Sequence, residues 1–175
     1  MVFKELPLKG AYLIENIELV DDRGFFSRTF CVKKFSDAGI NMNVVQSNLS
    51  YSKNKNILRG MHYQINAAAE KKLVKCILGK ILDVIIDIRE DSPTFGQHYK
   101  VELSQKNQKM LLVPEGFAHG FLTLVPNCYV FYQVSNYYDK ENERAIRWND
   151  PFFNIDWPIS NPILSKKDAN HPNFK

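Results

Sequence analysis

The chain has 175 residues and a mass of 20.3 kDa, which predicts one domain spanning residues 1–175, because compact domains cluster near roughly 100–200 residues. With 45% hydrophobic and 13% aromatic residues, the composition excludes an intrinsically disordered protein, which lacks the material for a core. The formal net charge is +4, and no run of five like charges concentrates it, so binding to nucleic acid or a membrane surface is disfavoured.

Period-two hydrophobic patterns predict strands along most of the chain. In chain order, the predicted strands are residues 10–14, 44–51, 72–78, 81–88, 99–103, 109–113, 120–124 and 129–134. The pair Gly79-Lys80 separates two of them and is typical of a type II′ turn, so we expect residues 72–78 and 81–88 to form a hairpin. Many short strands in one domain favour an all-β sandwich or barrel.

Two segments have helical signals. Residues 32–38 precede Gly39, a common helix terminator, and a second short helix is predicted after Ser165, an N-cap residue with Asp168 three positions on. Residues 1–7 lack an apolar signal core, and no stretch approaches the roughly 20 apolar residues of a membrane span, so we expect a cytoplasmic protein.

Three cysteines are present, and they lack the spacing of a zinc site or a disulfide framework. Cys31, Cys76 and Cys128 form no CxxC pair. Each is therefore expected to be a buried free thiol.

Polar side chains interrupt strand-like segments where a closed β domain normally places apolar residues. Arg59 and Gln64 lie in such a segment, residues 57–64, together with His62. Alternation puts Leu58, Gly60, His62 and Gln64 on one face, so His62 and Gln64 are predicted to point inward.

Two further polar residues share strand faces with apolar ones. Lys72 lies on the face of Val74 and Cys76, and Tyr132 lies between two valines on its own face, its hydroxyl available to a cavity. Taken alone, each residue has a common structural explanation: Lys72 as a solvated side chain, Tyr132 as a core residue, and His62 as a hydrogen-bonded structural residue. Together with His62 they form a base, an electrophile and an acid suited to making and quenching an enolate.

Ten segments in register, from about Phe3 to Asp168, resemble the dTDP-4-dehydrorhamnose 3,5-epimerase family. Among them are D-R-G-F-F at 22–26, Q-S-N-L-S at 46–50, L-R-G-M-H-Y-Q at 58–64, K-L-V at 72–74, V-P-E-G-F-A-H-G-F at 113–121, E-R-A-I-R-W-N-D-P at 143–151 and S-K-K-D at 165–168. The resemblance implies a cupin-type jelly roll, a homodimer, and a reaction without metal or organic cofactor.

The metal position of a cupin is expected to be empty. The pattern P-x-G-x-x-H at 114–119 is similar to the second cupin motif, but His62 is followed by Tyr63 and Gln64, so the first motif's ligands are missing. His62 and His119 alone make a poor site, because metals normally take three or more protein ligands.

The resemblance also implies the substrate class and the catalytic roles. The substrate is a nucleotide-linked 4-keto-6-deoxyhexose, whose C3 and C5 hydrogens both flank the C4 carbonyl. His62 matches the general base, Asp168 the carboxylate that orients it, and Lys72 the cation beside the C4 oxygen. Tyr132 matches the proton donor on the other face, a phenol whose pKa a neighbouring cation can lower.

Binding of the nucleotide diphosphate requires cations and hydrogen-bond donors. The positions that match the family's binding residues are Arg23, Gln46, Asn48, Arg59, His119, Glu143 and Lys167. Asp83 and Asp87, inside the predicted hairpin, are expected to be structural, either facing outward or paired with a cation.

Two residues depart from the family's pattern. Arg28 stands at a substrate-binding position where the family usually has Glu, and Lys71 stands where the family usually has Gln, before Lys-Leu-Val. A carboxylate accepts the N3 hydrogen of thymine, whereas Arg prefers the paired acceptors of guanine. A switch to a GDP carrier and simple repacking therefore both stay open.

Other functions also stay open. A C3-only epimerase or a ketoisomerase would reuse His62 with a differently placed acid, and a non-catalytic cupin would bind the nucleotide sugar without needing Tyr132. A metal-dependent cupin oxygenase is disfavoured by the missing ligands.

Overall fold

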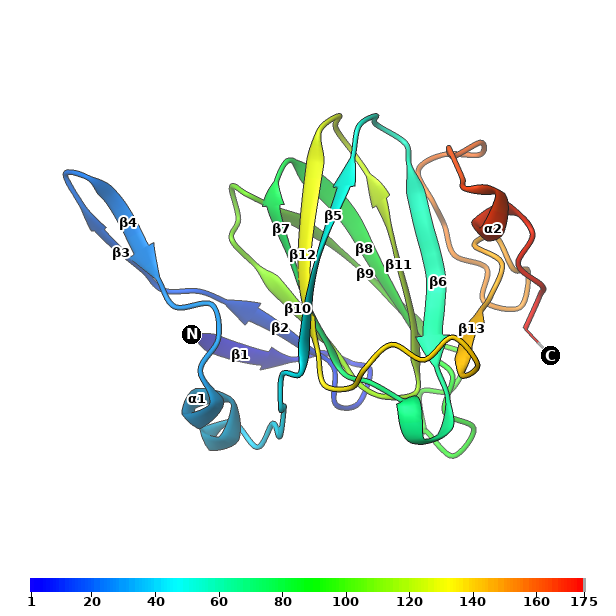
Figure 1. Cartoon of the computed structure of the whole chain (residues 1–175), viewed down its shortest axis with the longest axis horizontal. Helices are drawn as coiled ribbons and strands as arrows, with labels where there is room; N and C mark the ends of the chain where they lie inside the picture. Colours follow the sequence, from blue (N-terminus) through cyan, green and yellow to red (C-terminus); the bar gives the residue numbers. More distant parts are fainter. Residues whose placement is uncertain (175) are drawn as a thin grey trace.

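The computed structural model of the protein describes residues 1–174 and is built mainly from antiparallel strands (Figure 1). The strands are β1 (Val2–Glu5), β2 (Tyr12–Glu15), β3 (Glu18–Asp21), β4 (Gly24–Ser27), β5 (Gln46–Ser52), β6 (Leu58–Gln64), β7 (Lys72–Leu78), β8 (Lys80–Asp87), β9 (His98–Ser104), β10 (Met110–Val113), β11 (Phe117–Thr123), β12 (Cys128–Val134) and β13 (Glu143–Ala145). All predicted strands are confirmed, with ends within three residues of the prediction. β1, β3, β4 and β13 were not predicted.

The strands form two large sheets that pack face to face, which confirms the all-β sandwich. One sheet has the order β1-β2-β10-β7-β12-β5 and the other β13-β6-β11-β8-β9. Their inner faces meet in a core that includes Val74, Cys76, Ile81, Ile85, Leu111, Phe117, Phe121 and Val130. The core excludes water over most of the sandwich and leaves the polar inward residues at one end.

The outer face of the five-stranded sheet is covered by the C-terminal segment (Figure 1). Ala118 and Leu122 of β11 pack there with Phe153 and Trp157. Because side chains alternate along a strand, His119 lies on the opposite, inner face. The apolar side chains of β11 are thus buried against the C-terminal segment, and the inner face of the strand can carry a polar residue.

The predicted hairpin of residues 72–78 and 81–88 is wrong, although both strands exist. β7 pairs with β10 and β12 in one sheet, and β8 pairs with β9 and β11 in the other. Gly79, with φ +85°, carries the chain from one sheet to the other, and an added Cβ would lie 2.6 Å from the Cys128 sulfur. A positive φ suits both a II′ turn and this sheet-crossing corner, so the local pattern did not discriminate them.

Strict alternation also fails on β6. Its register with β11 shifts between Arg59 and His62, which oppose Phe121 and His119. Leu58 therefore packs in the outer core beneath the C-terminal segment, not on the face of His62 as predicted. The shift brings Arg59 to the same cavity as His62.

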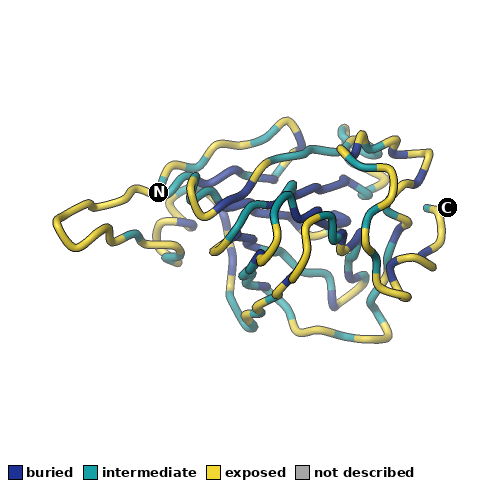
Figure 2. The backbone as a smooth tube through the Cα atoms, turned by 90° about the horizontal axis from the view of Figure 1, so that it is seen from above, coloured by how far each residue is buried: buried dark blue, intermediate teal, exposed yellow. Residues whose placement is uncertain are grey.

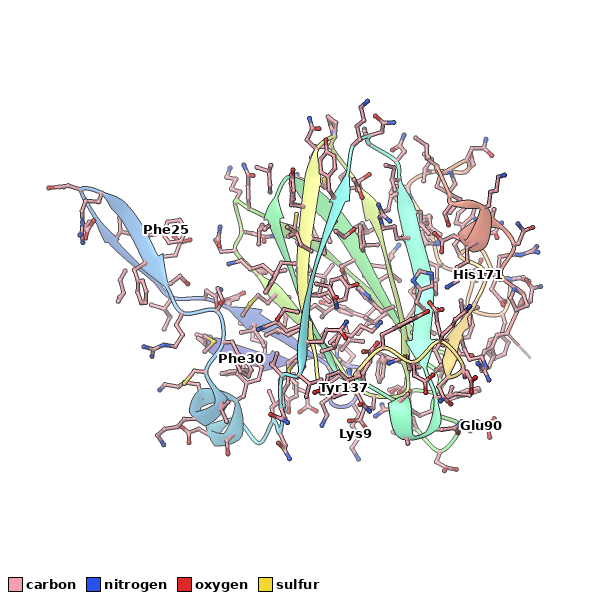
Figure 3. The ribbon with its side chains drawn as sticks, in the orientation of Figure 1. Lys9, Phe25, Phe30, Glu90, Tyr137 and His171 are labelled. Atoms are coloured by element: carbon pink, nitrogen blue, oxygen red, sulfur yellow. The ribbon has the colours of Figure 1, made fainter. Side chains whose placement is uncertain are left out.

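The unpredicted strands β3 and β4 form a hairpin that projects from the body of the molecule (Figure 1) and is exposed along its length (Figure 2). Leu19, Val20, Phe25 and Phe26 are between 53% and 74% exposed. Figure 3 shows Phe25 on this hairpin, away from the two sheets.

The two predicted helices are confirmed as α1 (Val32–Asp37) and α2 (Lys166–Ala169), and a 3-10 turn, η1, covers Asn66–Ala68. Cys76 and Cys128 are buried free thiols as predicted, whereas Cys31 is only half-buried. No helix within residues 1–174 is both long and apolar enough to cross a membrane.

Candidate active site

Two adjoining cavities, of about 570 and 190 Å³, lie between the sheets and share His62, Lys72 and Tyr132 as lining residues. The larger is within the range of ordinary small-molecule sites. The three residues that the sequence singled out for enolate chemistry therefore meet around one space large enough for a sugar.

Lys72 and Tyr132 come from one wall, the six-stranded sheet. In the register of β7 with β12, Val134 opposes Lys72 and Tyr132 opposes Val74. Side chains two residues apart on a strand share a face, so both polar groups point between the sheets.

His62 comes from the opposite wall. It lies on β6 of the five-stranded sheet, directly across from His119 of β11. The imidazole of His62 and the phenol of Tyr132 are thus carried by facing sheets, on either side of the same cavities.

Asp168 binds the imidazole of His62 as predicted. The Oδ1 atom of Asp168 lies 2.7 Å from His62 Nε2. The Oδ2 atom accepts a hydrogen bond of 2.8 Å from Ser165 Oγ. The backbone N–H of Asp168 donates in turn to Ser165 Oγ, which caps α2. Burial alone would raise the pKa of Asp168, but the hydrogen bonds from His62 and Ser165 lower it to about 2. Because an ionised carboxylate only accepts, Nε2 of His62 carries the proton and Nδ1 keeps its lone pair.

Glu70 holds the ammonium of Lys72. The Oε1 and Nζ atoms lie 3.1 Å apart, and the two side chains are 10% and 12% exposed. Burial raises the pKa of Tyr132, and the charge of Glu70 raises it further, with only partial relief from Arg59. A neighbouring cation, Arg59, does lower the pKa as expected, but burial and Glu70 outweigh it and the pKa is raised overall. Tyr132 therefore stays protonated, as a proton donor must.

His119 lines the smaller cavity and is backed by Asp83. The two oxygens of Asp83 lie 2.9 and 3.0 Å from His119 Nε2. Asp83 does not face outward; it is fully buried, and burial raises its pKa. Asp87 is also buried and pairs with Arg89 at 2.7 Å, so pairing with a cation is confirmed for Asp87, whereas the partner of Asp83 is the imidazole of His119.

The remaining predicted binding residues are divided between the cavities. Gln46 and Asn48, joined by a hydrogen bond of 3.0 Å, and Glu143 line the larger one. Glu143 accepts a 2.6 Å hydrogen bond from Lys167, whose side chain is 60% exposed and lines neither cavity. Arg59 lines the smaller cavity and is held by Ser52 Oγ and the carbonyl of Tyr51.

Three predicted or departing residues lie away from both cavities. Arg23 is 90% exposed at the tip of the β3–β4 hairpin, where it pairs with Asp21, and Arg28 follows the same hairpin. Lys71 points to the carbonyl of Asn41. Within a single chain, neither arginine reaches the site.

Sequence reasoning missed Glu70, Tyr138 and His171. Glu70 and Tyr138 line the larger cavity, and His171 Nε2 lies 3.2 Å from Asp168 Oδ1. The signal for Glu70 was its spacing two residues before Lys72, and for His171 its spacing three residues after Asp168.

This arrangement can move protons without any other group. The lone pair of His62 Nδ1 can take a proton, the ammonium of Lys72 can stabilise an oxyanion, and the protonated Tyr132 can return a proton from the facing wall.

Comparison with known proteins agrees with this chemistry. The family model described as dTDP-4-dehydrorhamnose 3,5-epimerase matches residues 5–175. The enzyme of that name from Shigella flexneri is 47% identical over 155 residues, covering 88% of this chain and 85% of the relative.

Solved structures match over nearly the whole chain. The dTDP-4-dehydrorhamnose 3,5-epimerase of Bacillus anthracis with TDP and PPi bound superposes with a TM-score of 0.96 at 43% identity, covering 99% of this chain and 100% of that one. The epimerase of Legionella pneumophila in complex with dTDP-4-keto-L-rhamnose has a TM-score of 0.92 at 38% identity, covering 98% and 92%. These likenesses confirm the cupin-type jelly roll, and with the matched family they establish that the chain belongs to the dTDP-4-dehydrorhamnose 3,5-epimerase family.

Proposed function

We propose that this protein is an isomerase that epimerises a dTDP-linked 4-keto-6-deoxyhexose at C3 and C5. The observation that carries the proposal is the placement of His62 and Tyr132 on facing sheets around one cavity that also holds Lys72. Inversion at carbon needs a base on one face and an acid on the other, and this site supplies both.

The reaction begins with removal of the C3 or C5 proton by His62 Nδ1. The C–H electron pair forms the enolate, and its negative oxygen at C4 is stabilised by the ammonium of Lys72. Asp168 stabilises the imidazolium through Nε2. Tyr132 then protonates the same carbon from the opposite face, and the phenolate and imidazolium exchange protons with water to restore the starting state. No metal or organic cofactor is needed for these steps.

The nucleotide diphosphate is bound by cations and N–H donors in and beside the cavities, since such groups suit the two phosphates. Arg59 and His119 line the smaller cavity, and Lys167 is held beside the larger one by Glu143. Gln46 and Asn48 provide neutral contacts in the larger cavity. A thymidine carrier is favoured over GDP because the relatives named above are dTDP-sugar enzymes, two of them solved with thymidine nucleotides.

The active species is a homodimer in this proposal. The β3–β4 hairpin exposes Leu19 and Phe26, which oppose each other across the two strands, and a row of exposed apolar side chains typically marks a protein interface. Arg23 and Arg28 would then reach the partner's cavity rather than their own. Sedimentation of the wild type should give a dimer. The double variant Leu19→Asp with Phe26→Asp should give a monomer. A monomeric wild type would end this part of the proposal.

A cytoplasmic location stays a prediction from the sequence.

Solvent isotope incorporation tests the reaction. Incubation with dTDP-4-keto-6-deoxyglucose in D₂O should place deuterium at both C3 and C5, read by mass and NMR. One label would indicate a C3-only epimerase, a moved carbonyl a ketoisomerase, and no label a non-catalytic binding protein. Any of these three results would overturn the proposed double epimerisation.

A further inference from the structure

A third side chain, His171, completes a set of metal-ligating atoms around the base. His171 Nε2 lies 3.4 Å from His62 Nε2 and 3.2 Å from Asp168 Oδ1, and Asp168 Oδ1 lies 2.7 Å from His62 Nε2. Figure 3 shows His171 beside α2 and the edge of β6. These three atoms all lie within 4.8 Å of one another. From the sequence, only His62 and His119 were candidate metal ligands.

The two imidazoles have the separation of a shared metal. Zinc–nitrogen bonds of about 2.05 Å at a tetrahedral angle put two nitrogens about 3.3 Å apart, and ring centres about 5.2 Å apart when both nitrogens aim at the ion. In the structure the Nε2 atoms lie 3.4 Å apart and the ring centres 5.4 Å apart, with the rings perpendicular. Both rings therefore direct Nε2 into the same small space.

The carboxylate oxygen closes the third corner. The distance of 3.2 Å between Asp168 Oδ1 and His171 Nε2 already suits two ligands of a tetrahedral ion. The distance of 2.7 Å between Asp168 Oδ1 and His62 Nε2 would have to lengthen by about half an ångström. Asp168 and His171 side chains are 7% and 9% exposed, so two of the ligands are held by the packed interior. His62 and Asp168 line the smaller cavity, which gives an ion a route in and room for water as a fourth ligand.

We propose that His62, Asp168 and His171 form a site for Zn²⁺ or a similar divalent transition metal, and that occupation of this site switches off proton abstraction. Two imidazoles and one carboxylate are a common ligand set for such ions. The metal is an inhibitor in this proposal, not a cofactor.

The inhibition follows from the tautomer of His62. In the free protein the Nε2 proton faces Asp168, and the lone pair of Nδ1 is available to the substrate. When Nε2 coordinates the metal, its proton leaves to solvent and one is taken up at Nδ1, so the imidazole stays neutral. Nδ1 then donates instead of accepting, and His62 no longer acts as a base. This second half of the proposal rests on the proposed epimerase function, whereas the binding half does not.

Untagged protein in a non-chelating buffer tests the binding half. Calorimetric titration with Zn²⁺ should show one ion per chain, and Co²⁺ should give the intense visible bands of a four-coordinate site. His171→Asn should weaken binding about 100-fold or more, since losing even an outer partner of a ligand costs about 10–100-fold. His98→Asn is the matched control, because it removes another imidazole on β9, away from the site. Absence of binding, or equal affinity in wild type and His171→Asn, would overturn the site.

Deuterium exchange into the substrate tests the inhibition half. One equivalent of Zn²⁺ should abolish exchange in wild type and in His98→Asn, and EDTA should restore it. His171→Asn, compared with its own metal-free rate, should need about 100-fold more Zn²⁺ for the same inhibition. Stoichiometric binding with undiminished exchange would refute the switch. A chain that binds Zn²⁺ through His171 yet never exchanges deuterium would refute the epimerase function and keep the site.

Discussion

The ammonium of Lys72 is held in place before substrate binds, because its Nζ lies 3.1 Å from Glu70 and its side chain is 12% exposed. A charge fixed in advance at a developing oxyanion costs no reorganisation during the reaction. Lys72→Met should therefore reduce turnover by about 10²–10³-fold, measured as the rate of deuterium exchange at C3. Lys71→Met is the matched control, since Lys71 points away to Asn41. Equal losses in the two variants would contradict the role of Lys72.

Tyr132 supplies the proton that makes the reaction an inversion. Without its hydroxyl, His62 still removes the C3 proton, but only the same face can be reprotonated, by the imidazolium that has exchanged with solvent. Tyr132→Phe should thus incorporate deuterium at C3 with retention of configuration, as followed by NMR. Inverted product formed at the wild-type rate would show that another group is the acid.

At the residue scale, the sequence identified the reacting groups but not their neighbours. His62, Lys72 and Tyr132 stood out because each places a polar group on an apolar strand face. Glu70 and His171 did not, because they lie just outside strands, where polar residues are ordinary, and their contacts depend on how β7 and α2 pack. The same limitation applies to the pKa of Tyr132, which burial controls.

The turn after β8 illustrates stabilisation at the scale of an element. Asp87 is fully buried, and burial opposes its ionisation, but hydrogen bonds from Arg89, Ser92 and Thr94 lower its pKa to about 2. A folded-state pKa below the ordinary 3.8 contributes stability that is present above that value and is lost as the pH falls through about 2.

Asp87→Asn should therefore cost about 2 kcal/mol of unfolding free energy at pH 7. The difference from wild type should shrink toward zero as the pH approaches 2, measured by urea denaturation across this range. Asp91→Asn, in the exposed part of the same turn, should leave both the stability and its pH dependence unchanged. A constant difference at all pH values would argue against an ionic origin.

Strand positions were predictable at this scale, but strand partners were not. Residues 72–78 and 80–87 have the composition of strands wherever they pair, and a glycine between them permits either a hairpin or a crossing between sheets. The β3–β4 hairpin was missed for a different reason. Its residues are exposed on both faces, so no alternation marks a buried side.

At the scale of the whole molecule, Arg28 comes directly after the β3–β4 hairpin, which projects from the body of its own chain (Figure 1). In the proposed dimer its charge acts on the partner's nucleotide site. We expect calorimetry to show that the wild type prefers dTDP to GDP, and that Arg28→Glu increases the affinity for dTDP about tenfold, because a carboxylate can accept the N3 hydrogen of thymine. Tighter binding of GDP by the wild type would instead support the carrier switch.

The short helix α2 both caps itself and orients the base, since Ser165 Oγ bonds to the backbone and to the carboxylate of Asp168. This four-residue helix contacts the sandwich mainly through β6, whereas each strand of the sheets is hydrogen-bonded to its neighbours. We therefore expect α2 to unfold first on warming. Catalysis should accordingly disappear several degrees below the temperature at which circular dichroism records melting of the sheets, and should return on cooling. The highest temperature at which the enzyme works is then determined by the unfolding of α2 and not by the stability of the two sheets.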